Sequence, residues 1–124
     1  MGLVICPPGQ HLGNFERITY EELLRQHTTR KGISPQDKSV YVVAGAYRNT
    51  FSDAGRVLKY CESVHDKIGN RWLQRQVGNT VCVFLNLKSG SHRYFRCGPY
   101  QVADKTDGFW VLTRVADGCA PVAC

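Results

Sequence analysis

The sequence lacks any long apolar run and the motifs of common hydrolases and NTPases. No segment approaches the roughly 18 apolar residues that span a bilayer, so we expect no membrane insertion. The chain contains no G-x-S-x-G, no H-E-x-x-H and no P-loop, which leaves esterase, zinc protease and NTPase hypotheses without a basis. No Asn-x-Ser/Thr triplet occurs either, so N-glycosylation is not expected.

Clustered cysteines are also absent, because no two of the six lie closer than Cys119 and Cys124. Zinc sites need ligand spacings such as C-x2-C, so we expect no metal and no cofactor. An even and high cysteine count instead predicts a secreted domain closed by three disulfides. Six cysteines allow fifteen pairings, and the sequence does not choose among them, although Cys6 with Cys119 or Cys124 would tie down both ends. The predicted set is Cys6, Cys61, Cys82, Cys97, Cys119 and Cys124.

A secretory signal is not visible, since the apolar stretch at residues 3–5 is too short and ends at Cys6. We therefore expect the mature form of a secreted, extracellular protein. The length of 124 residues fits one domain spanning 1–124. A hydrophobic fraction of 43% supports a folded chain.

Positive charge is in excess but is spread along the chain. The formal net charge is +6, and the longest run of basic residues is Arg30–Lys31. A surface that follows phosphates usually shows clustered cations. We therefore expect no specific nucleic acid partner, and we expect a monomer.

Two helices are predicted. Thr19 and Glu22 form a capping box, which starts a helix over Tyr20 to Arg30 that stops at Gly32. A second helix is predicted from a cap at Thr50 or Ser52 to Gly69-Asn70. Its apolar positions recur every three or four residues, which places Cys61 on the core side. These positions are Ala54, Val57, Leu58, Cys61, Val64 and Ile68.

The remaining segments favour strands: Ser39–Tyr47 is rich in β-branched and aromatic residues and too short for a buried helix, and Thr80–Leu87 alternates with the period of a strand. The expected strands are Ser39–Tyr47, Thr80–Leu87, Arg93–Cys97, Tyr100–Ala103 and Gly108–Val115, with a break at Gly98-Pro99. The order of elements predicts an α+β fold, an antiparallel sheet of about four strands with two helices packed on one face. The opposite face would be open to a partner.

The sequence gives little evidence for a catalytic site. The four histidines, His11, His27, His65 and His92, are each expected to be solvated surface residues. The segment His92 to Arg96 combines a histidine, two arginines and aromatic rings, which is the composition of a small ribonuclease-like toxin. No carboxylate is evident beside these residues, so no catalytic residue is assigned and the chain is not expected to be an enzyme.

Two basic segments are candidates for a recognition surface. Trp72 is flanked by arginines, a composition typical of protein-binding hot spots. The alternative is a Trp packed under the sheet edge with arginines stacked on it. A second basic set brackets the Gly32 to Pro35 loop. The candidate residues are Arg30, Lys31, Lys38, Arg71, Trp72 and Arg75.

Together, the cysteine content, the element order and the segment Arg71-Trp72-Leu73-Gln74-Arg75 resemble the Leptosphaeria avirulence and suppressing (LARS) effectors of plant-pathogenic fungi. Gln74 and Gln76 stand where that family has basic residues. The resemblance implies a disulfide-linked, four-stranded antiparallel sheet with helices beside it. It also implies a non-enzymatic fungal avirulence or virulence protein.

On that resemblance, the expected function is protein–protein interaction in the host plant. The partner would be a host protein or an immune receptor, and the protein could mask another effector or be translocated into the host cell. The alternative is the ribonuclease-like toxin, and a third hypothesis is an extracellular defence or inhibitor protein.

Overall fold

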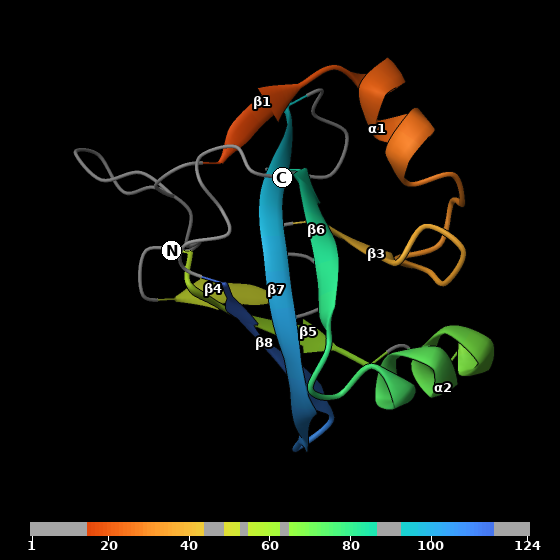
Figure 1. Ribbon diagram of the computed structural model, residues 1–124, viewed down its shortest axis with the longest axis vertical. Helices are drawn as coiled ribbons and strands as arrows, with labels where there is room; N and C mark the ends of the chain where they lie inside the picture. Colours follow the sequence, from red (N-terminus) through yellow and green to blue (C-terminus); the bar gives the residue numbers. More distant parts are fainter. Residues whose placement is uncertain (1–14, 44–48, 53–54, 63–64, 87–92, 116–124) are drawn as a thin grey trace.

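The chain folds mainly as a β-sheet, as a computed structural model shows (Figure 1). The structure describes residues 15–43, 49–52, 55–62, 65–86 and 93–115. These residues form eight strands and two short helices. In chain order they are β1 (Glu16–Ile18), α1 (Tyr20–Gln26), β2 (Ile33–Ser34), β3 (Ser39–Val43), β4 (Thr50–Ser52), β5 (Val57–Cys61), α2 (Lys67–Arg75), β6 (Thr80–Asn86), β7 (Tyr94–Thr106) and β8 (Phe109–Arg114).

The strands join in one sheet with the order β2-β3-β6-β7-β8-β5-β4, and β1 pairs with β7 beside this path. β3 and β6 run parallel, with Val40 opposite Val83, whereas the other pairs are antiparallel. The expected antiparallel sheet of about four strands is therefore wrong. The fold is a mostly β structure of eight strands in the described part of the chain.

The first helix begins where the sequence predicts and ends earlier. Thr19 is its N-cap, and its hydroxyl accepts a hydrogen bond from the Glu22 amide at 3.1 Å. The helix stops at Gln26 rather than Arg30. The reason is His27, whose ring is buried and bonds to two partners beyond the helix, so the chain turns away at this residue.

The second helix is misplaced in the sequence prediction. Residues 50–52 and 57–61 form the antiparallel pair β4 and β5, and Gly55 adopts a φ of 89° in the turn between them. Leu58 and Tyr60 of β5 are buried while Lys59 is exposed, which is the alternation of a strand. Helix α2 begins only at Lys67, so Gly69 and Asn70 lie in its first turn instead of ending a helix. Cys61 is consequently a strand residue.

The break expected at Gly98-Pro99 does not end the strand. β7 continues through it for 13 residues and pairs with β1, β6 and β8. Gly98 has a φ of 116°, and the register with β6 shifts between Val83 and Phe84. A β-bulge of this kind bends a strand without terminating it. The two predicted strands are therefore one.

The helices do not pack on the same face of the sheet. Side chains of β6 alternate, so Val83 and Leu85 face one way and Phe84 the other. Leu73 of α2 belongs to the large core that contains Val83 and Leu85, whereas Leu23 of α1 packs with Phe84 in a second cluster. The prediction of two helices on one face and an open opposite face is wrong, because β6 is covered on both sides.

The helices in the described part of the chain are too short to cross a bilayer.

Candidate functional site

Three separate segments meet at the phenol of Tyr60, near the end of β5. A Cβ built on Gly32 would overlap the Tyr60 hydroxyl, so the loop after α1 passes directly against the ring. Asp66 lies close enough for its negative charge to act on the same phenol. Burial, with the Asp66 charge added, raises the pKa of Tyr60 well above its usual value. We call Gly32, Tyr60 and Asp66 the Tyr60 junction.

Asp66 connects this junction to helix α2. Its carboxylate is the N-cap and accepts a hydrogen bond from the Gly69 amide at 3.0 Å. A Cβ on Gly69 would overlap that carboxyl group, so the close approach requires glycine. Lys31 Nζ lies 3.8 Å from Asp66 Oδ1. The start of α2 and the loop of residues 28–38 are therefore placed side by side.

His27 holds the base of this loop. Its Nε2 lies 2.7 Å from the Lys31 carbonyl oxygen, which can only accept, so Nε2 carries the proton. Nδ1 then accepts from the Ser39 hydroxyl, also at 2.7 Å. Burial lowers the pKa of His27, although the Lys31 carbonyl and the charge of Asp37 oppose it. The imidazole is buried and neutral, so the expectation of a surface histidine is wrong here.

Asp37 closes the other side of the loop. It accepts hydrogen bonds from the Thr28 amide and hydroxyl, at 2.7 and 2.8 Å, and from the Ser34 hydroxyl. Burial alone would raise its pKa, but these hydrogen bonds, from Ser34 and then Thr28, outweigh it and lower the pKa of Asp37. The loop is therefore fixed at both ends, and Arg30, Lys31 and Lys38 project from an ordered backbone.

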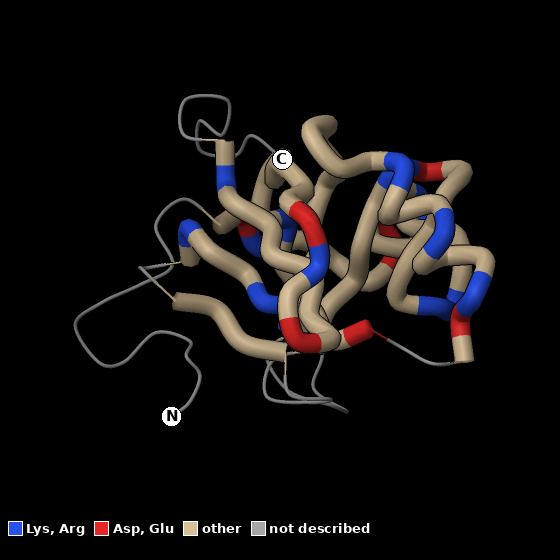
Figure 2. Tube along the Cα trace, turned by 90° about the horizontal axis from the view of Figure 1, so that it is seen from below, with Lys and Arg blue, Asp and Glu red and all other residues tan. Residues whose placement is uncertain are grey.

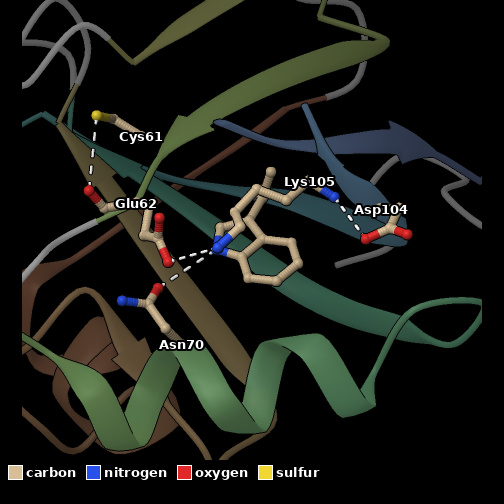
Figure 3. Close-up of polar contacts among 6 residues, drawn as sticks. Cys61, Glu62, Asn70, Asp104 and Lys105 are labelled. Atoms are coloured by element: carbon tan, nitrogen blue, oxygen red, sulfur yellow. Dashed lines mark hydrogen bonds and ion pairs between the residues drawn. The ribbon is translucent and has the colours of Figure 1, made fainter. Parts of the chain in front are cut away.

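Hydrogen bonds also fix Cys61 and Glu62, which lie at the end of β5 and just after it. Asn49 Oδ1 accepts from the Cys61 amide at 2.7 Å. Lys105 donates to Glu62 Oε2 at 2.8 Å, as Figure 3 shows. Trp110 donates from its indole nitrogen to Asn70 Oδ1 at 3.3 Å, and Lys105 Nζ lies 5.3 Å from the Trp110 ring centroid. β5, α2 and the β7–β8 hairpin thus form one connected polar network.

Several cations on α2 and the neighbouring loop have no acid in ion-pair range among the residues that the structure describes. Figure 2 shows Lys and Arg segments over much of the molecule, and several of them lie on the side where Figure 1 places α1, the loop and α2. The Lys31–Asp66 pair is long and the lysine is 62% exposed, so it neutralises little of this charge. These cations are Arg30, Lys38, Lys67, Arg71 and Arg75.

The structure brings the two predicted basic segments to the same end. Arg71 and Arg75 are exposed on α2, and Lys31 contacts the helix cap from the loop. Trp72 is half-buried and packs against the large core, which is one part of the alternative predicted for this residue. Lys67 belongs to the same basic surface and was missed. Its spacing of four residues from Arg71 would have revealed it had the helix been placed correctly.

The ribonuclease-like arrangement is not assembled in the described residues. His92, like His11, lies outside them, and Arg96 contacts the carboxylate of Glu16 at 3.2 Å. Cys61, Cys82 and Cys97 lie in β5, β6 and β7, whereas Cys6, Cys119 and Cys124 fall outside the described residues. The three disulfides stay a prediction. No group of three potential metal ligands occurs among the described residues.

The backbone is similar to solved structures of the SRA domain of SUVH5. One is its complex with methylated CHH DNA, with a TM-score of 0.60 and 21% identity over 92% of this chain and 94% of that one. Another is its complex with fully methylated CG DNA, with a TM-score of 0.56 and 18% identity over 92% and 95%. The chain has an SRA-like fold. No protein-family model and no curated protein matches the sequence.

This likeness corrects the partner prediction. Both SRA structures are complexes with methylated DNA, which contradicts the expectation of no specific nucleic acid partner. Folding brings cations from two distant segments, residues 30–38 and α2, next to each other, which their spread along the sequence does not reveal.

Proposed function

We propose that the protein is a non-catalytic DNA-binding domain of the SRA type. The observation that carries this proposal is the backbone similarity, which extends over 92% of the chain to complexes with methylated DNA. The partner is duplex DNA, and cytosine methylation is the modification to test first. Such a partner is also consistent with the formal net charge of +6.

The geometry around the Tyr60 junction supports the proposal. The loop of residues 28–38 is fixed by His27 and Asp37 and presents exposed cations beside the start of α2. Because the backbone that carries these cations is fixed before binding, little backbone entropy is lost when they contact phosphates. Cations on fixed backbone also set the orientation of a duplex, which base recognition requires.

The test compares binding to three duplexes of identical sequence, unmethylated, CG-methylated and CHH-methylated, by fluorescence anisotropy at one fixed salt concentration. We expect tighter binding to at least one methylated duplex. Binding that is equal for all three would overturn methyl recognition. Absence of binding at low salt would overturn DNA binding itself.

A variant pair locates the surface. Arg30→Ala with Lys38→Ala should weaken DNA binding severalfold, because the variant lacks two of the cations that are proposed to contact phosphate. Arg56→Ala with Lys59→Ala is the matched control, since both side chains are exposed and neither residue belongs to the loop of residues 28–38 or to α2. Equal losses for the two pairs would show that overall charge, rather than this surface, accounts for binding.

The similarity to SRA structures gives no support to a secreted effector. The resemblance to LARS effectors stays a prediction, as does secretion.

A further inference from the structure

Helix α2 carries a row of three cations that nothing in the fold explains. Lys67, Arg71 and Arg75 are all exposed and follow one another at intervals of four residues. At a rise of about 1.5 Å per residue they stand about 6 Å apart along the axis, on one side of the helix. Leu73 is buried, so the row faces away from the core.

This arrangement is unfavourable for the isolated fold. Like charges four residues apart repel one another in a helix. Lys67 also stands in the first turn, where a cation opposes the helix dipole, and Asp66 at the N-cap is the only acid at this end of α2 among the described residues. Within the described residues no carboxylate lies in ion-pair range of any of the three. A polyanion lying along the helix would remove the repulsion.

The observations favour a nucleic acid backbone over a membrane surface. A helix that lies on a membrane presents several apolar side chains beside its cations. α2 exposes only Ile68 among its large apolar side chains, because Leu73 is buried and Trp72 packs against the core. The row also adjoins the basic loop at the Lys31–Asp66 contact. A regular line of cations matches a partner whose charges are themselves regularly spaced.

We propose that α2 lies along the phosphate backbone of bound DNA and contributes affinity without contributing base or methyl discrimination. The inference rests on the proposed function and assigns α2 to contacts with phosphate. Arginine and lysine contacts to phosphate are independent of sequence. Discrimination between methylated and unmethylated DNA would then belong to other parts of the protein.

The experiment is the salt dependence of binding to the preferred duplex. Each phosphate contact contributes about −0.9 to the slope of log K against log salt concentration, measured between about 50 and 200 mM. Arg71→Gln with Arg75→Gln should make the slope shallower by about 1.8. The ratio of affinities for methylated and unmethylated DNA should stay unchanged. Glutamine keeps helix propensity, and thermal melting checks the fold.

The control pair Arg56→Gln with Lys59→Gln removes the same charge elsewhere and should change the slope less. If the wild-type protein binds DNA and the α2 pair leaves the slope unchanged, or changes the methylation ratio, the inference is wrong while the proposed function stands. If the wild-type protein binds no DNA, the proposed function fails. Loss of binding to anionic vesicles by the α2 pair, with an unaltered DNA slope, would assign the row to a membrane surface instead.

Discussion

At the residue scale, the Tyr60 hydroxyl lies so close to Gly32 that no side chain fits at residue 32 without a shift. Gly32→Ala should lower the free energy of unfolding by about 1–3 kcal/mol, because the added methyl group would overlap the Tyr60 hydroxyl. Tyr60→Phe removes that hydroxyl and should restore part of the loss in the double variant. Urea unfolding of the four proteins measures the coupling. Additive effects of the two substitutions would show that this contact does not restrict residue 32.

His27 should make stability depend on pH. Burial keeps its pKa below the ordinary value of 6.5, so the unfolded chain binds a proton before the folded chain does. The free energy of unfolding should therefore fall as the pH drops from about 6.5 towards the lowered pKa. His27→Gln should flatten this fall in urea titrations. Equal pH slopes for the variant and the wild-type protein would contradict the role of burial.

At the scale of elements, the cap of α2 links local and tertiary structure. Asp66→Ala removes the side chain that accepts from the Gly69 amide and should cost about 1 kcal/mol of unfolding free energy. Asp104→Ala is the control, because among the described residues that exposed carboxylate bonds only to the amide of its neighbour Lys105. A thermal melt compares the two. If both variants melt alike, the N-cap does not contribute to stability.

Elements whose apolar residues fit only one periodicity, helical or alternating, could be predicted from the sequence. The Thr19 cap, the strand from Thr80 and the strand around Trp110 all occur where local preference and burial agree. Residues 50–61 could not be predicted reliably. Their apolar side chains fit both a helical and an alternating period, and the choice is made by the turn at Gly55 and by pairing with β8.

Sheet order depends on contacts that local sequence does not encode. β3 pairs in parallel with β6, although β4, β5 and α2 lie between them in the chain. The same limit applied to the candidate site. The cations of residues 30–38 and those of α2 could be named individually, but the contacts of Tyr60 and Asp66 with the loop, which lie where the two segments meet, could not be predicted.

At the scale of the whole molecule, the predicted disulfides remain open to a direct measurement. Without reductant, the intact mass should be lower by about six hydrogens, two for each disulfide. Reduction should then lower the stability, since losing one native disulfide in a small domain costs about 2–5 kcal/mol. Identical masses before and after reduction would remove the sequence-based argument for an extracellular protein.

β7 is the strand through which the two parts of the sheet are joined. In the described residues, β2, β3 and β6 lie on one side of it and β8, β5 and β4 on the other. Neither part can separate without breaking β7, so unfolding should occur in a single cooperative transition. Backbone amides in the middle of β7, around the buried Tyr100, should therefore be among the last to exchange with deuterium.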